Sequence, residues 1–362
     1  MNDTKLKSWI DSVVKNTPNF LDRMKDRNIP GRFKYSLSGD IKYPFSWGLG
    51  NTVFATKTYY MLNRMDLADA ADMSGYIKSY QNRESYIFDP LIQMLSWPMR
   101  ILNALRFLDL NNLLGEQNKR AETRQAFAAL SALGDKPDIP FNRIPYTKSE
   151  IKGYIHSLDW EKPWGAASHF SHLIFFLAMN KKFFQHKGAL TDDLLQYAFK
   201  ELQKYNQIDG SWHKTGIFIE DYQKVNGGMK VMTAFGNYKK ITFAHPDRLI
   251  DLCFSTLNSG NACNHFNLIC LLYNCSKETD YKKTEIILYF KERLKLYKEH
   301  WWDDAGGFSF YSRNTNRVYY GAYVSRGLPE PDIHGTHLFL WGIVLISKAL
   351  GWNEYGLKEP IT

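Results

Sequence analysis

Side chains that can transfer protons occur where several apolar, helix-patterned segments of this chain begin. His169 and His172 are three residues apart, so both can face the same side of one helix. His265 and His334 begin two later segments. Imidazole exchanges protons near neutral pH, and a pair on one face could transfer a proton or bind an anion. For His172 the alternative is a core histidine that is bonded to a neighbouring carbonyl group.

The candidate acid–base groups are His169, His265, His334, Asp332 and Tyr320. The neighbouring Tyr323 is an alternative phenol donor. Asp332 directly precedes a helix-patterned segment, where a carboxylate could instead accept hydrogen bonds from the free N–H groups of the first turn. Asp332 is therefore either a catalytic group or a helix cap.

The same helix starts could bind an anionic substrate, because they offer free N–H groups and the positive end of the helix dipole. Lys230 would add charge, and the preceding Gly227 and Gly228 would allow close backbone approach, although Lys230 could also be an ordinary surface lysine. Tryptophans in the loops could line an isoprenoid channel, stack on sugars, or merely pin the turns. The candidate substrate-binding residues are Trp47, Asn51, Arg124, Trp164, His172, Asn226, Lys230, Asn264 and His337.

Composition narrows the class of protein. The 362 residues include 46 Lys and Arg against 37 Asp and Glu, a formal net charge of +9 that favours anionic partners. The basic residues are scattered and no nucleic-acid motif occurs, so we do not expect nucleic acid as a partner. No long uncharged apolar run is present, and we expect neither a membrane span nor a signal peptide. Four cysteines fall in one mostly helical stretch, which predicts free thiols and a cytoplasmic protein.

Helical periodicity predicts the elements that must position these residues. Amphipathic outer helices are expected near 4–26, 68–82, 148–157, 190–206, 246–258 and 281–300. More apolar inner helices are expected near 47–63, 90–108, 165–181, 226–237, 261–276 and 334–350. The stretch 121–130 is either an extra outer helix or an inner helix that displaces the second pair, and alternation around 318–324 predicts a short hairpin. The predicted fold is all-α, an (α/α)6 toroid that forms one domain over 1–362 with a β-hairpin in a C-terminal loop.

Two phrases from about Trp160 onward carry a resemblance to a known superfamily. The segments 207–212, with the letters QIDGSW, and 303–308, with the letters DDAGGF, each precede an inner helix. They resemble the glutamine–tryptophan repeats of terpenoid cyclases and protein prenyltransferases. The first phrase is one residue shorter than the cyclase pattern and the second lacks the Gln. The resemblance implies six hairpins closed into an α/α toroid; similar turns also occur in α/α-barrel enzymes that act on carbohydrates.

A second resemblance concerns the zinc site of protein prenyltransferase β-subunits. That family places Asp-x-Cys and Asp-x-x-His-Thr at the mouths of two inner helices. Here Asn261 stands in place of the first Asp, Cys263 matches the cysteine, and His334 is shifted by one position. The resemblance implies Cys263 and His334 as tentative zinc ligands, with His265 or Asp332 as further candidates. From the residues alone, Cys263 could also be a nucleophile or a small buried hydrophobe.

Three classes of function remain open from the sequence. By resemblance, the leading expectation is a transferase or cyclase that acts on a prenyl diphosphate. The alternative is a carbohydrate-active toroid, a lyase, epimerase or hydrolase that uses His and Tyr on an acidic sugar or oligosaccharide. The third is a binding toroid without catalysis. Hydrolysis is disfavoured because two clear cavity carboxylates are not evident, and motifs of serine hydrolases, kinases and dehydrogenases are missing.

Overall fold

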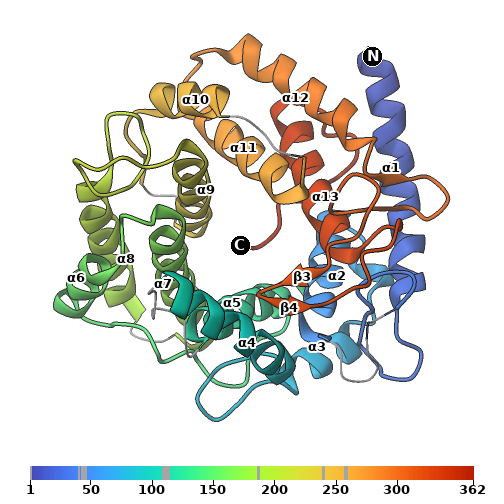
Figure 1. The fold of residues 1–362 in the computed structure, drawn as a ribbon, viewed down its shortest axis with the longest axis horizontal. Helices are drawn as coiled ribbons and strands as arrows, with labels where there is room; N and C mark the ends of the chain where they lie inside the picture. The colour runs from blue at the N-terminus through green and yellow to red at the C-terminus, as the bar shows by residue number, and fades with distance from the viewer. Residues whose placement is uncertain are drawn as a thin grey trace. The chain divides into compact units, whose positions relative to one another are not determined.

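The computed structural model describes residues 2–39, 41, 47–107, 115–185, 188–238, 241–256 and 260–362. This part of the chain is mostly helical (Figure 1). It also has two small antiparallel hairpins, of which Figure 1 labels β3 with β4. It divides into two compact units. Unit 1 comprises 1–138, 260–263 and 290–361, and unit 2 comprises 139–259, 264–289 and residue 362. The prediction of one domain stays a prediction.

Unit 1 contains the N-terminal helices, the two hairpins and the C-terminal helix. Its helices are α1 (Asp3–Met24), α2 (Leu49–Met61), the 3-10 turn η1 (Met65–Leu67), α3 (Ala70–Lys78), α4 (Pro90–Phe107), α5 (Glu116–Ala132) and α13 (Ile333–Ala349), with the later part of α12 (Lys283–Tyr297). Its strands are β1 (Trp301–Trp302), β2 (Gly307–Phe308), β3 (Val318–Tyr319) and β4 (Ala322–Tyr323). The first residues of α11 (Ala262–Cys275) also belong to unit 1.

Three helices of unit 1 form a contiguous layer, because α13 packs on α2 and α2 packs on α5 (Figure 1). Nearly every residue of α2 is buried, as expected for a helix that has apolar residues on all sides. Phe54 of α2 joins Phe20, Tyr35 and Trp47 in one core cluster. The predicted inner segments 47–63 and 334–350 are therefore confirmed as buried helices.

The predicted C-terminal hairpin is confirmed. Strand β3 pairs with β4 in the register Val318 to Tyr323 and Tyr319 to Ala322. The two turn residues, Tyr320 and Gly321, have φ angles of 50° and 81°. Two successive residues with left-handed φ angles suit the two-residue turn that joins the strands of a hairpin. Tyr320 is unusual here, because a non-glycine residue rarely adopts this conformation. A second hairpin, β1 with β2, was not predicted.

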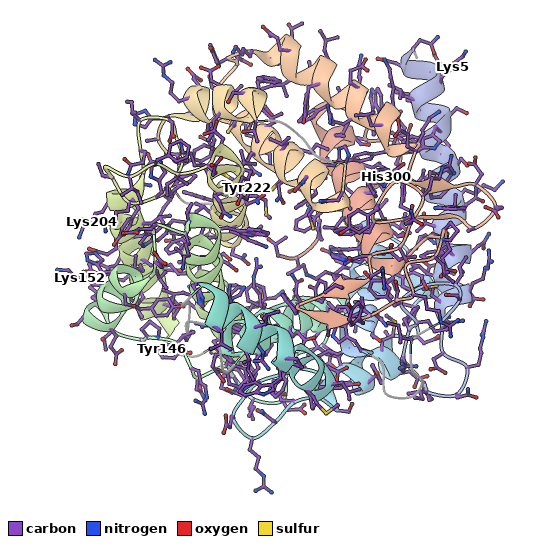
Figure 2. All side chains as sticks on the ribbon, viewed as in Figure 1. Lys5, Tyr146, Lys152, Lys204, Tyr222 and His300 are labelled. Atoms are coloured by element: carbon purple, nitrogen blue, oxygen red, sulfur yellow. The ribbon has the colours of Figure 1, made fainter. Side chains whose placement is uncertain are left out.

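Unit 2 contains helices in the order that the periodicity predicts. They are α6 (Lys148–Ser157), α7 (Pro163–Phe184), α8 (Gly188–Leu202), the 3-10 turn η2 (Gln203–Tyr205), α9 (Asp221–Asn237), α10 (Pro246–Ser255) and most of α11. Helix α7 packs along α9, and a Cβ added to Gly227 would lie 3.0 Å from the carbonyl oxygen of Pro163. The expected close backbone approach at this glycine is thus made to α7. Lys152 and Lys204 lie on the sides of α6 and η2 that face away from α7 (Figure 2).

The prediction for the second helix pair is wrong about which helix is buried. Segment 90–108 was expected to be a buried inner helix, but on α4 the side chain of Leu105 is 74% exposed and that of Met94 is 63% exposed. Helix α5 is buried instead, including its polar residues Glu122 and Arg124. The alanine-rich sequence of α5 allows close packing, and its polar groups find partners inside the unit. The alternative that 121–130 displaces an inner helix is the better description.

Among the helices that the structure describes, none combines the length and the apolar character that a membrane crossing requires.

Candidate functional site

A pocket of about 240 Å³, counting the part that opens to solvent, lies beside α2 in unit 1. Most of this volume is shared with open solvent, and the enclosed space holds about one water molecule. Helix α2 and the residues before it supply most of the wall, α5 supplies two polar side chains, and β3 supplies a tyrosine. The lining residues are Trp47, Leu49, Gly50, Val53, Phe54, Glu122, Gln125 and Tyr319.

Glu122 is the buried carboxyl group of this pocket, with 4% of its surface exposed. Its Oε1 accepts a hydrogen bond of 2.5 Å from Nε1 of Trp47, and its Oε2 accepts one of 3.1 Å from the backbone N–H of Asp89. Burial raises the pKa of Glu122 well above its usual value, and the nearby carboxyl of Asp89 raises it further. The hydrogen bonds from Trp47 and from the backbone of Asp89 lower the pKa, so burial and hydrogen bonding act on this carboxyl group in opposite directions.

Asp89 fixes the start of α2 relative to α5. Its Oδ2 accepts a 3.0 Å hydrogen bond from the N–H of Gly48, and its Oδ1 accepts one of 3.0 Å from the N–H of Leu91. Burial also raises the pKa of Asp89, whereas these backbone bonds lower it. The carboxyl of Asp89 thus organises the pocket wall without lining it.

Aromatic rings form another part of the pocket wall. The ring of Trp47 stacks on that of Tyr319 with centroids 4.4 Å apart, and Tyr319 contacts Tyr320 at 4.2 Å. Burial is the main reason that the pKa of Tyr320 is raised to about 12. Tyr320 therefore keeps its phenolic proton, as a hydrogen-bond donor must.

Two imidazoles pack against Phe54, one of the pocket-lining residues. The Phe54 ring lies 4.7 Å from the ring of His334 and 5.1 Å from that of His337. Both histidines are more than nine-tenths buried, and their Nδ1 atoms have no hydrogen-bond partner among the described residues. Burial lowers the pKa of His334 to about 3 and that of His337 well below its usual value. Both rings are therefore neutral, and burial makes them poor proton acceptors.

The start of α13, where both histidines lie, is fixed by Asp332. Its Oδ1 accepts a 2.7 Å hydrogen bond from the N–H of Gly335, and its Oδ2 accepts one of 2.9 Å from the N–H of Phe310. The alternative reading of Asp332 as a helix cap is therefore confirmed. Thr336 adds a second tie, because its Oγ1 accepts a 2.9 Å hydrogen bond from the N–H of Phe308.

Positive charge lies beside the pocket on α5 and α2. Arg124 is 5% exposed, burial lowers the pKa of its guanidinium to about 10, and the interaction with Tyr320 acts in the opposite direction. Lys57 donates a hydrogen bond to Gln125 and is close enough to His337 to lower the pKa of that imidazole. The neighbourhood of the pocket can therefore bind an anion.

Two other predicted residues of unit 1 lie close to this group. The Nδ2 of Asn51 donates to the carbonyl oxygens of Phe33 at 3.1 Å and of Trp47 at 2.8 Å, so this amide braces the pocket wall. Cys263 is partly buried and interacts electrostatically with Tyr311 and Tyr319.

The tentative zinc ligands Cys263 and His334 do not fit a zinc site. Across the described ranges, no three His, Cys, Asp or Glu side chains come together as a metal would require. Zinc needs three protein ligands even at a catalytic site, so no step of the chemistry is assigned to a metal.

The remaining candidates lie in unit 2. The rings of His169 and His172 are 6.4 Å apart on α7, as their spacing predicts. Helices α9 and α11 are joined by a hydrogen bond of 2.6 Å, which Nδ2 of Asn267 donates to Oδ1 of Asn226. His265, two residues before Asn267 on α11, is buried. The other three are more accessible: Trp164 is exposed, and Lys230 and Asn264 are partly buried.

Sequence reasoning missed Glu122, Asp89 and Tyr319. Glu122 lies in a stretch that lacks apolar periodicity, and its burial follows only from the packing of α5 on α2. A charged residue inside an alanine-rich segment near Arg124 was the available signal. Comparison with known proteins finds no matching family model and no matching curated protein.

Proposed function

We propose that the pocket of unit 1 is the active site of a carbohydrate-active enzyme, a lyase or epimerase, that acts on an acidic sugar by acid–base catalysis. Glu122 carries this proposal: it is a buried carboxyl whose pKa is raised by burial, it lines an aromatic pocket, and it is held by Trp47. Trp47 is 3% exposed and stacks on Tyr319, so a sugar ring would have to displace Tyr319 to pack on the indole. A raised pKa suits a general acid at neutral pH.

The step that this arrangement supports is removal of the proton on the carbon next to a carboxylate. The C–H bond breaks, its proton goes to a general base at the pocket, and its electron pair moves into the carboxylate to form an enolate. His334 and His337 do not line the pocket and their lowered pKa values make them weak bases, whereas Arg124 would neutralise the charge that develops. Positive charge beside an enolate lowers the barrier to forming it.

The enolate can react further in two ways, and a single proton donor serves for both. Return of a proton to the opposite face of the carbon gives an epimer. In the lyase reaction the electron pair instead forms a C=C bond, the C–O bond to the neighbouring sugar breaks, and the departing oxygen takes the proton of Glu122. Both outcomes use the same proton abstraction, so the proposal is stated for both.

A prenyl diphosphate is the second candidate, since it was expected from the resemblance. Leu49, Val53 and Phe54 in the pocket wall would suit an isoprenoid chain. Diphosphate leaves as an anion, however, and does not require a protonated carboxyl such as Glu122 in its binding pocket. The acidic sugar therefore accounts for more of the described residues.

The proposed arrangement of the whole chain is the six-hairpin toroid expected from the sequence. Its support is the alternation of amphipathic and apolar helices and the packing of α13, the last inner helix, on α2, the first. The two ends of a ring of inner helices must meet in this way.

Ligand-dependent thermal stability tests the proposed function. We expect oligosaccharides of uronic acids to raise the melting temperature of the wild-type protein, and Arg124→Gln to abolish this rise. Arg83→Gln, at an exposed position of unit 1, is the matched control and should keep the response. Stabilisation by prenyl diphosphates and not by uronates would contradict the proposal, and no response to either would favour a different class of ligand.

A further inference from the structure

Helix α4 presents a row of large apolar side chains to solvent. Met94, Trp97, Ile101 and Leu105 follow one another at intervals of three, four and four residues, which places them on one face of the helix. Each is at least 36% exposed, and Leu102 beside them is 54% exposed. We call these five residues the α4 face. Contiguous exposed apolar surface of this kind marks an interaction site.

The charges of α4 indicate what this face binds. The 18 residues of the helix include two arginines and no aspartate or glutamate. The guanidinium of Arg100 lies 5.4 Å from the centre of the Trp97 ring, next to the apolar row. Apolar residues with tryptophan, flanked by arginine, are the composition of helices that lie in the interface of an anionic bilayer.

The apolar surface continues onto the neighbouring hairpin. Helix α4 contacts β4, where Tyr323 is 62% exposed, and Val318 on the paired strand is also exposed. The guanidinium of Arg317 lies 5.8 Å from the centre of the Tyr323 ring and adds a further positive charge. This hairpin also carries Tyr319 of the pocket wall.

We propose that the α4 face docks the protein onto an anionic membrane surface, with α4 lying in the plane of the interface. The apolar row would enter the boundary between headgroups and acyl chains, and the positive charge of Arg317 on the neighbouring hairpin would favour anionic lipid headgroups. The formal net charge of +9 favours approach to such a surface. The inference does not depend on the reaction proposed for the pocket, since it concerns a different surface and a different ligand.

Sedimentation of the full chain with lipid vesicles tests this proposal. Vesicles of phosphatidylcholine and phosphatidylserine in equal parts are compared with vesicles of phosphatidylcholine alone. We expect stronger binding to the anionic vesicles and weakening by added salt. The double variant Trp97→Gln with Leu105→Gln should reduce the partition coefficient at least about tenfold, because two apolar side chains no longer enter the bilayer.

The matched control is Phe218→Gln with Ile208→Gln, which removes two exposed apolar residues of unit 2 and should leave vesicle binding unchanged. Circular dichroism of both variants checks that the helices remain folded. Equal binding by wild type and the α4 variant would overturn the proposal. So would absence of vesicle binding together with a dimer that the α4 variant converts into a monomer, since the face would then bind a second copy of the chain.

Discussion

The indole N–H of Trp47 donates a hydrogen bond of 2.5 Å to the carboxyl group of Glu122, which is 75 residues away in sequence. The bond joins the segment before α2 to the first turns of α5. It also accounts for how a carboxyl group can be buried in an apolar pocket, because a buried polar group without a partner would cost about 1–3 kcal/mol. The remaining oxygen is bonded to the backbone of Asp89.

Replacing Glu122 with Gln tests its role as the acid. The amide oxygen can still accept from Trp47, but the amide NH2 then faces the N–H of Asp89, so we expect a loss of about 1–3 kcal/mol of stability in a protein that still folds. Catalytic turnover should fall by about 10²- to 10⁴-fold, because the proton donor is lost. Assays of both properties on the same preparation separate loss of chemistry from loss of folding.

The pH dependence of catalytic activity also tests the role of Glu122 as proton donor. Since burial raises the pKa of Glu122, wild-type activity should persist at neutral pH and decline as the pH rises through that raised pKa. Glu116→Gln, on the exposed side of the same helix, serves as the control and should keep both the rate and the profile. An unchanged profile in Glu122→Gln would show that another group donates the proton.

Asp332→Ala should destabilise the protein by about 2–4 kcal/mol, because the N–H groups of Gly335 and Phe310 lose their acceptor inside the protein. Asp332→Asn keeps one acceptor oxygen and should cost less. Urea denaturation of the three proteins at one pH measures the difference. Equal stability of Asp332→Ala and the wild type would contradict the capping role.

The stability of the wild type should also depend on the protonation of Asp332. Burial raises its pKa to about 7 in the folded chain, from about 3.9 when unfolded. The contribution of this group is therefore fully present below about pH 4 and is lost as the pH rises through about 7. In Asp332→Asn this titration is removed, so its free energy of unfolding should fall less across the same range than that of the wild type.

Gly335 and Gly153 form a contrasting pair for alanine substitution. A Cβ added at Gly335 would lie 2.5 Å from the backbone nitrogen of Phe310, whereas nothing lies within 4 Å of one added at Gly153. Gly335→Ala should therefore cost about 1–3 kcal/mol through overpacking. Gly153→Ala should stabilise α6 by about 0.5–1 kcal/mol through helix propensity. Thermal unfolding of both variants measures the expected loss of stability in Gly335→Ala and the expected gain in Gly153→Ala.

The neutral state of His334 can be observed directly. Free imidazole titrates near about pH 6.5, but burial lowers the pKa of His334 to about 3. Nitrogen-15 spectra of the protein, assigned by comparison with His334→Gln, should show a neutral ring at every pH at which the protein remains folded above this value. A titration of that signal near neutral pH would mean that water or a charged partner reaches the ring.

Local patterns predicted most helices, because amphipathic and apolar periodicity survive whatever the helices pack against. Segments 148–157 and 334–350 differ from α6 and α13 by one residue at most at each end. The sequence left open whether 121–130 displaces the second inner helix, and it could not decide because α4 is the more apolar of the two helices. Burial of α5 depends on partners such as Trp47 and Asp89, which are distant in sequence.

The residues of the site were also predicted only in part, because some of them lie in recognisable local patterns and others do not. Helix-start patterns singled out His334, His337 and Asp332; the structure packs the two histidines against Phe54, and Asp332 caps the helix that carries them. Glu122 carries no such pattern. Its chemistry arises from removal of a carboxyl group from water, which only the packed structure determines.

Hydrogen exchange at the substrate carbon tests the central claim most directly. The protein is incubated with uronic acid oligosaccharides in heavy water, and the sugars are analysed by mass spectrometry. We expect deuterium at the carbon next to the carboxylate in epimerised sugar, or an unsaturated sugar after elimination, and a large loss of both with Arg124→Gln. The account would be contradicted if uronates bind the wild-type protein and are recovered without deuterium, epimerisation or unsaturation.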